Sequence, residues 1–183
     1  MPAALMMAHL QAVAHGRLLD LDDSVVRPSP EALVTALNRD FRGRFGNHRY
    51  ATMFYGELDS TKKILRYINA GHCPPILISG AGEAMILKES DLPVGLFPEI
   101  QYRELQVNLP SGSSIVVFSD GVPDALNSQG EEFGEERIIS CCTSLPRGAS
   151  AETICMGLFS KVAEWAAGVD QFDDTTILVV SVD

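Results

Sequence analysis

Apolar positions along this chain follow two periods, that of an α-helix and that of a β-strand. The helical period predicts four helices, at residues 2–15, 29–41, 135–144 and 150–165. Ser29 can cap the second helix, and Pro30 suits its first turn. The second and the last helix each carry one apolar face, formed by Leu33, Leu37 and Phe41 in the former and by Ile154, Leu158, Val162 and Trp165 in the latter.

The remaining apolar segments are short and rich in β-branched residues, which predicts strands. They lie at residues 51–58, 63–70, 75–79, 84–87, 102–109, 113–119 and 175–182. Turn residues such as Gly71 separate the first four, a pattern typical of antiparallel hairpins. Because strands and helices do not alternate regularly, we expect an α+β layered sandwich rather than a parallel sheet.

Composition sets limits on the fold and on the partners. With 183 residues, 46% of them hydrophobic, the chain can bury one substantial core, so we expect a single domain over residues 1–183. A formal charge of −10 opposes binding to nucleic acid and to anionic membranes. The sequence has no apolar run as long as a membrane span, and its apolar opening lacks the basic start of a signal peptide. A cytoplasmic protein is expected, with reduced thiols at Cys73, Cys141, Cys142 and Cys155.

Three aspartates stand where predicted strands end or begin. Asp120 follows the strand at 113–119, and Asp173 and Asp174 precede the strand at 175–182. If these strands are neighbours, the carboxylates meet at one edge of a sheet, and such hard oxygen ligands suit Mg²⁺ or Mn²⁺. The alternative is that these residues only form turns, as Asp-Gly and Asp-Asp pairs in loops usually do.

Four segments of the chain occur in the same order as in the bacterial SpoIIE-type serine phosphatases. They are ATMFYGELDSTKKILRYINAGHCPPILI, DLPVGLFPEIQYRE, VVFSDGVPDALNSQGEEFGEERI and DQFDDTTILVV. The chain resembles this family, a branch of the metal-dependent protein phosphatases that are similar in fold to protein phosphatase 2C, over nearly its whole length. The resemblance implies an α/β/β/α sandwich of two mostly antiparallel sheets flanked by helices.

The resemblance also implies the residues of the site. Asp120 resembles the metal ligand of the family's Ser/Thr-Asp-Gly motif, and Asp173 resembles the ligand near the C-terminus. Gly121 would permit the turn beside Asp120, and Asp174 would support the ligands from a position where wider relatives often have Asn. Two Mn²⁺ or Mg²⁺ ions would activate a water to attack phosphoserine or phosphothreonine, so no catalytic side chain beyond the metal ligands is expected.

One motif of the family is absent from this sequence. In the family, a segment of the type Asp-Val-Ser-Gly-Lys-Gly, whose first Asp bridges the two metals, precedes the helix that here begins at Pro2. We therefore expect an N-terminally truncated domain that is catalytically incomplete with Asp120 and Asp173 alone. The missing strands would leave sheet edges unpaired, and another chain or a second copy, forming a homodimer, is expected to cover them.

Two other residues, Cys141 and His72, are candidates for catalysis, but each also has a purely structural interpretation. Cys141 and Arg147 have the spacing of the phosphate loop in cysteine-dependent tyrosine phosphatases. Because Pro146 removes a backbone amide from that loop, a core thiol beside an ordinary arginine is the favoured interpretation. His72, in the turn NAGHCPP, would either donate a proton to a leaving group or bond the loop backbone with its ring.

The sequence thus predicts a metal-dependent serine/threonine phosphatase domain. By resemblance, its substrate is a small phosphorylated regulatory protein of the anti-anti-sigma type, in bacterial stress or developmental signalling. The alternative is a non-enzymatic binding module that keeps the fold and the partner surface without turnover.

Overall fold

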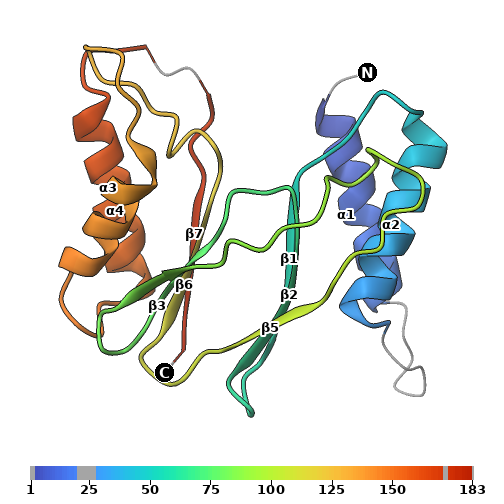
Figure 1. Cartoon of the computed structure of the whole chain (residues 1–183), viewed down its shortest axis with the longest axis horizontal. Helices are drawn as coiled ribbons and strands as arrows, with labels where there is room; N and C mark the ends of the chain where they lie inside the picture. Colours follow the sequence, from blue (N-terminus) through green and yellow to red (C-terminus); the bar gives the residue numbers. More distant parts are fainter. Residues whose placement is uncertain (1–2, 20–27, 171–172, 183) are drawn as a thin grey trace. The chain divides into compact units, whose positions relative to one another are not determined.

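The computed structural model describes residues 3–19, 28–170 and 173–182. Its helices are α1 (Ala3–Leu19), α2 (Pro30–Phe45), α3 (Gly134–Ser144) and α4 (Ala151–Trp165), and its strands are β1 (Met53–Asp59), β2 (Ile64–Ala70), β3 (Ile76–Ile78), β4 (Ala84–Ile86), β5 (Leu105–Asn108), β6 (Ser114–Phe118) and β7 (Ile177–Ser181) (Figure 1). The predicted α+β class is confirmed. Within the described ranges, no helix combines the length and the apolar character needed to cross a lipid bilayer.

The chain divides into two compact units. The first consists of Met1–Asp59, Leu65–His72 and Glu89–Val107, and the second of Ser60–Ile64, Cys73–Lys88 and Asn108–Asp183. A single domain over residues 1–183 therefore stays a prediction.

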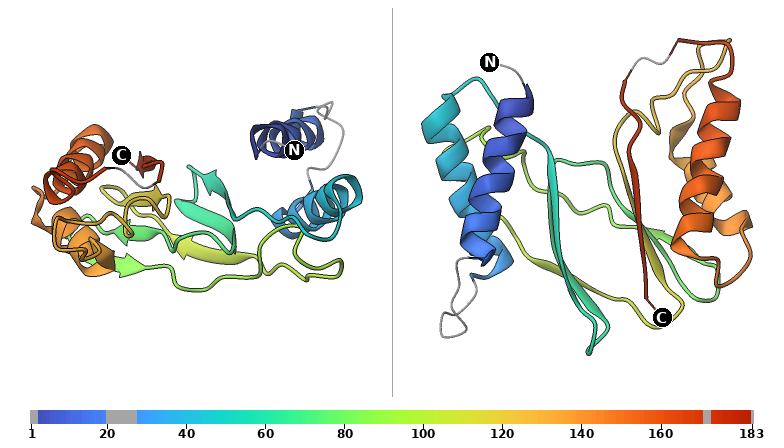
Figure 2. Two further views of the ribbon diagram at one scale, coloured as in Figure 1. Left: turned by 90° about the horizontal axis from the view of Figure 1, so that it is seen from above. Right: turned by 180° about the vertical axis from the view of Figure 1, so that it is seen from behind.

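In the first unit, α1 and α2 pack against each other, and Figure 2 shows them as a pair. The predicted cap of α2 is confirmed, because Ser29 Oγ accepts a hydrogen bond from Ala32 N at 3.2 Å and Pro30 opens the helix. The apolar face of α2 packs with strand β2 in one core, formed by residues such as Leu33, Val34, Leu37, Phe41, Ile68 and Ala70. The three-stranded sheet has the order β1-β2-β5.

In the second unit, a four-stranded sheet has the order β4-β3-β6-β7, and every neighbouring pair in it is antiparallel. Helices α3 and α4 lie beside this sheet (Figure 1). They share a core with β3 and β6 that includes Ile76, Val116, Ile138, Ile154, Leu158 and Val162. Three of the four residues predicted for the apolar face of α4 are thus buried, and Trp165 packs against the same core.

The elements differ from the predicted ones in several bounds, such as the later end of α2 at Phe45 and the shorter β5, and in one strand connection. Helix α1 extends to Leu19, beyond the predicted end at residue 15. The predicted series of hairpins is wrong at Gly71, because β2 and β3 belong to different sheets: β1 and β2 are neighbours in one sheet, and β3 and β4 pair in the other. A local turn residue cannot specify which sheet the next strand joins, since that choice depends on long-range pairing.

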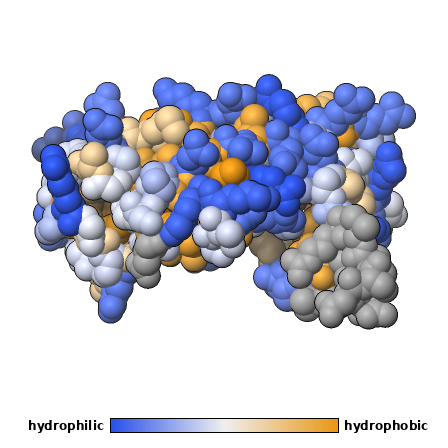
Figure 3. All heavy atoms as spheres, turned by 90° about the horizontal axis from the view of Figure 1, so that it is seen from below, coloured by the Kyte–Doolittle hydropathy of each residue, from blue (hydrophilic) through white to orange (hydrophobic). Residues whose placement is uncertain are grey.

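Strand β7 is an outer strand of its sheet. Its side chains alternate, and Leu178 and Val180 are 56% and 37% exposed. In the view of Figure 3, apolar residues appear at several places among the hydrophilic ones that dominate the surface. That another chain or a second copy covers such an edge stays a prediction.

Candidate metal site

The candidate site lies where β6 ends and β7 begins. These strands are antiparallel neighbours with Phe118 opposite Ile177, so the last residue of β6 faces the first of β7. The segment that follows β6 carries Asp120, and the segment that precedes β7 carries Asp173 and Asp174. The condition set above, that the two strands are neighbours, is therefore met, although their paired ends lie far apart in the sequence.

A tight turn after β6 presents Asp120. Val122 N donates to Ser119 O at 3.0 Å, and Asp124 N donates to Asp120 O at 3.0 Å. The carboxylate of Asp120 is itself oriented, because its Oδ1 accepts a hydrogen bond from Gly121 N at 3.1 Å. Asp120 is exposed while the two residues after it are buried, so the turn places the charge outside the core.

Gly121 allows the two segments to approach each other. A Cβ atom at this position would lie 2.5 Å from Asp174 O and 2.9 Å from Asp174 C. Real Cβ atoms essentially never approach backbone so closely, so any side chain would push the β7 segment away. Glycine is required here by this contact with another segment; Gly121 is not among the described glycines with a positive φ, so its predicted role in permitting the turn stays a prediction.

Two hydroxyl groups connect the same segments. Ser119 Oγ donates to Asp174 O at 2.9 Å and accepts from Thr176 N at 2.9 Å. Thr175 Oγ1 donates to Gly121 O at 3.3 Å. Neither hydroxyl group was predicted from the sequence to take part in the site. Ser119 directly precedes Asp120 and Gly121, and Thr175 directly follows Asp173 and Asp174.

Asp173 and Asp174 contribute in different ways. Asp173 Oδ1 accepts a hydrogen bond from Asp174 N at 2.7 Å, which orients its exposed carboxylate. Asp174 contributes its backbone oxygen to the contacts with Ser119 and Gly121. The supporting role of the Asp174 side chain and the ligand roles of Asp120 and Asp173 all stay predictions.

The carboxylates suit a hard divalent cation in kind. Among the residues that the structure describes, however, no group of three or more His, Cys, Asp or Glu side chains could hold a metal ion. Further ligands would have to be water, a substrate oxygen or protein groups outside the described ranges. The site thus fits an open cation site with few protein ligands better than a closed structural one.

Cys73 also lies within electrostatic reach of this turn. Burial raises the pKa of its thiol, and the negative charges of Asp120 and Asp124 raise that pKa further. The thiol is thereby kept neutral rather than activated. No sequence spacing indicated this proximity, because Cys73 and Asp120 lie far apart in the chain, next to the strands β3 and β6 that pair with each other.

The cysteine-phosphatase alternative is disfavoured by the environment of Cys141. Burial raises the pKa of this thiol, whereas a nucleophilic cysteine needs a lowered pKa. Cys142, on the same helix, is buried more deeply, and burial raises its pKa to about 12. Both thiols belong to the core of the second unit, which confirms the predicted core role.

His72 follows a constrained turn in the first unit. Its backbone N donates to Asn69 Oδ1 at 2.8 Å, and Asn69 Nδ2 donates to His72 O at 3.0 Å. Gly71 has a φ of 74°, and a Cβ there would lie 2.6 Å from Pro93 Cγ, so glycine is required. Both alternatives for the imidazole ring stay predictions.

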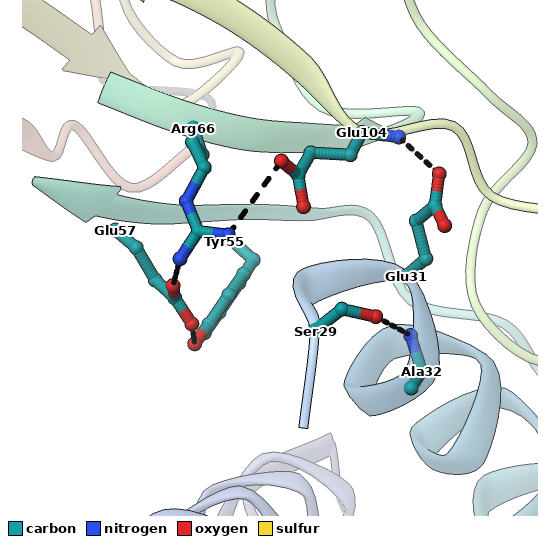
Figure 4. Close-up of polar contacts among 7 residues, drawn as sticks. All are labelled: Ser29, Glu31, Ala32, Tyr55, Glu57, Arg66 and Glu104. Atoms are coloured by element: carbon teal, nitrogen blue, oxygen red, sulfur yellow. Dashed lines mark hydrogen bonds and ion pairs between the residues drawn. The ribbon is translucent and has the colours of Figure 1, made fainter. Parts of the chain in front are cut away.

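A second group of carboxylates lies in the first unit (Figure 4). Arg66 of β2 donates to Glu57 of β1 at 2.5 Å and forms an ion pair with Glu104 at 3.7 Å. Tyr55 donates its hydroxyl to Glu57 at 2.6 Å, and Glu31 of α2 accepts from Glu104 N at 3.2 Å. We call this arrangement the Arg66 network. The guanidinium of Arg66 offsets part of the negative charge of the carboxylates around it.

The whole chain matches a known protein family. Residues 1–183 match the family described as Stage II sporulation protein E (SpoIIE). The chain is 31% identical to Protein IcfG of Synechocystis sp. over 134 residues, which cover 72% of this chain and 20% of that protein. It is 28% identical to Phosphoserine phosphatase RsbU of Bacillus subtilis over 130 residues, which cover 70% of this chain and 37% of that protein. The matches thus span between a fifth and about two fifths of these relatives.

Solved structures show the same fold. The SiaA-PP2C domain of Pseudomonas aeruginosa matches with a TM-score of 0.80 and 22% identity, over 100% of this chain and 71% of that one. RsbX in complex with magnesium matches with a TM-score of 0.64 and 15% identity, over 96% of this chain and 71% of that one. The similarity to structures of this fold therefore includes one determined with a divalent metal.

Proposed function

This chain belongs to the stage II sporulation protein E (SpoIIE) family, and we propose that it is a metal-dependent phosphatase domain that hydrolyses phosphoserine or phosphothreonine on proteins. The observation that carries the proposal is the pairing of β6 with β7, which brings the Asp120 turn against the segment of Asp173 and Asp174. The name of RsbU as a phosphoserine phosphatase supports the reaction class.

Asp120 and Asp173 would hold a divalent cation, Mn²⁺ or Mg²⁺. Both carboxylates are exposed, and each accepts a hydrogen bond from the backbone N–H of the residue that follows it. When bound, such an ion supplies Lewis-acid chemistry, lowering the pKa of water and offsetting charge on phosphoryl oxygens. Asp174 and Gly121 keep the two segments in contact, and no nucleophilic side chain is required.

We propose further that the chain by itself is catalytically incomplete. Two carboxylates from the described residues are fewer than a tightly held pair of ions needs, so affinity for Mn²⁺ should be weak and turnover slow. The same observation favours a second candidate, a phosphatase-like binding module that recognises a phosphoprotein without hydrolysing it.

The partner would be a small phosphorylated regulatory protein of the anti-anti-sigma type, in the cytoplasm. The net charge of −10 supports a protein partner over a nucleic acid or an anionic membrane. We also propose that two copies of the chain can pair through an outer strand of a sheet to form a homodimer.

The test is hydrolysis of para-nitrophenyl phosphate and of a phosphoserine protein as a function of Mn²⁺, with Asp120→Asn and Cys141→Ser beside the wild type. We expect weak activity that requires Mn²⁺, is lost in Asp120→Asn and persists in Cys141→Ser. Loss of activity only in Cys141→Ser would overturn the metal mechanism. Binding of the phosphoprotein without any hydrolysis at saturating Mn²⁺ would establish the binding module instead.

A further inference from the structure

Ser119, directly before Asp120, departs from the regular hydrogen bonding of an antiparallel sheet. In a regular ladder, two residues of a hydrogen-bonded pair exchange N–H and C=O groups. Ser119 N donates to Thr176 O at 3.0 Å, but Thr176 N donates to Ser119 Oγ at 2.9 Å. The Ser119 carbonyl instead accepts from Val122 N at 3.0 Å. The hydroxyl of Ser119 therefore takes the place of its own carbonyl in the ladder.

This substitution lets the chain turn without separating the strands. The freed Ser119 carbonyl closes the turn that carries Asp120, while the hydroxyl keeps β6 bonded to the segment before β7. The same hydroxyl donates to Asp174 O at 2.9 Å, directly after Asp173. Thr175 adds a bond in the opposite direction, from its Oγ1 to Gly121 O at 3.3 Å. Both candidate ligands thus lie next to residues that these two hydroxyl groups tie together.

We propose that Ser119 and Thr175 are positioning residues that hold the backbones of Asp120 and Asp173 for one shared divalent cation. This hydroxyl clasp, formed by Ser119 Oγ and Thr175 Oγ1, rests on the proposed metal-dependent function. Neither hydroxyl is proposed as a ligand of the ion or as a group that contacts the substrate. Each acts through the backbone of a neighbouring residue, because its partners are the Asp174 and Gly121 carbonyls and the Thr176 amide.

The clasp makes a specific chemical demand on position 119. The side chain must donate one hydrogen bond and accept another, which a hydroxyl does with its single O–H and its lone pairs. Alanine would remove the side-chain partner of both the Thr176 amide and the Asp174 carbonyl, whereas threonine would retain it. At position 175, valine removes the hydroxyl with little change in shape, and serine keeps it.

The first measurement is a titration of the whole chain with Mn²⁺, followed by the electron paramagnetic resonance of the free ion. We expect Ser119→Ala and Thr175→Val to weaken Mn²⁺ binding by about tenfold or more, the size of effect typical of groups that orient metal ligands. Ser119→Thr and Thr175→Ser should bind with nearly wild-type affinity. Ser160→Ala, at an exposed position of α4 in the same unit, is the matched control and should bind like the wild type.

The second measurement is amide hydrogen exchange without metal, which reports on the clasp itself. In Ser119→Ala the amides of Thr176 and Val122 should exchange faster, while amides in the middle of β6 keep their protection. If Ser119→Ala does not fold, Thr175→Val, Ser119→Thr and Thr175→Ser still test the clasp. Each of them keeps a hydroxyl at position 119 and therefore its hydrogen bonds.

Asp120→Asn separates the clasp from the function on which it rests. Weaker Mn²⁺ binding in Asp120→Asn, Ser119→Ala and Thr175→Val, with recovery in the conservative variants, supports both proposals. Weaker binding in Asp120→Asn but unchanged binding in Ser119→Ala and Thr175→Val overturns the clasp and leaves the metal site standing. Unchanged binding in Asp120→Asn overturns the metal site, and the clasp with it.

Discussion

Two groups of carboxylates in this chain, one in each compact unit, are held by different partners. In the first unit, Glu57 and Glu104 are held by the guanidinium of Arg66, a charged partner. In the second unit, the carboxylates of Asp120 and Asp173 accept hydrogen bonds from backbone amides of the residues that follow them. A guanidinium neutralises a carboxylate as it orients it, whereas a backbone amide orients it without adding net charge.

This difference explains why similar residues suit different tasks. The Arg66 network joins the strands β1 and β2 and the residue before β5, so its charges serve the fold of the sheet. The Asp120 turn keeps its negative charge at an exposed position, where a cation can reach it. Clusters of acidic residues are thus distinguished by their partners rather than by their number.

The largest expected effect comes from removing one charge from each group. Asp120→Asn should weaken Mn²⁺ binding by about 100-fold, since loss of a ligand should exceed the roughly 10- to 100-fold effect of losing a supporting group. Glu57→Gln, the matched change in the Arg66 network, should leave Mn²⁺ binding unchanged. Isothermal titration calorimetry of both variants checks this, and equal losses in the two would contradict the distinction between the groups.

The close approach at Gly121 provides the next effect. Gly121→Ala should lower the free energy of unfolding by about 2 kcal/mol, because the new Cβ meets the Asp174 backbone and the segment must shift. Gly43→Ala is the control, since a Cβ at this position of α2 would meet no neighbouring segment within 4 Å and should stabilise by about 0.5–1 kcal/mol. Urea unfolding followed by circular dichroism measures both, and a neutral Gly121→Ala would argue against the tight contact.

Breaking the Arg66 network should have a smaller effect, confined to stability. Arg66→Met should lower the free energy of unfolding by about 1 kcal/mol, near the upper end for partly exposed ion pairs, because Arg66 is 43% exposed but contacts two carboxylates. Lys161→Met, which removes the exposed pair with Glu164, should cause no measurable change. Thermal unfolding of both variants tests the ranking, and weaker Mn²⁺ binding in Arg66→Met would show that the network also serves the site.

The last effect, no larger than that of Arg66→Met and confined to high pH, comes from the buried thiol of Cys142, which belongs to neither carboxylate group. Because burial raises the pKa of Cys142 from 9.0 to about 12, the folded state holds its proton where the unfolded state loses it. Stability from this group is complete below pH 9 and declines as the pH rises toward 12, by up to about 1 kcal/mol between pH 9 and 10. Urea unfolding at these two pH values should show a smaller decline in Cys142→Val than in the wild type. An equal decline would assign the loss to other groups.

Local pattern determined most of the elements of this fold. The spacing of Leu33, Leu37 and Phe41 and the cap at Ser29 predicted α2, because helix period and capping depend on residues within a few positions of one another. The apolar run before Asp120 likewise predicted β6. The place of Asp120 and Asp173 beside strand ends followed from these elements, and their proposed role came from family resemblance.

The partners of those elements were decided only by the tertiary structure. The sequence could not show that β2 and β3 enter different sheets, or that Cys73 lies within electrostatic reach of Asp120, since strand pairing joins residues far apart in the chain. Nor could it show that Ser119 Oγ replaces its own carbonyl in the ladder. A hydroxyl finds its partners only when the second strand is in place. The sequence by itself therefore placed Asp120 and Asp173 beside strand ends, and folding decided what holds those ends together.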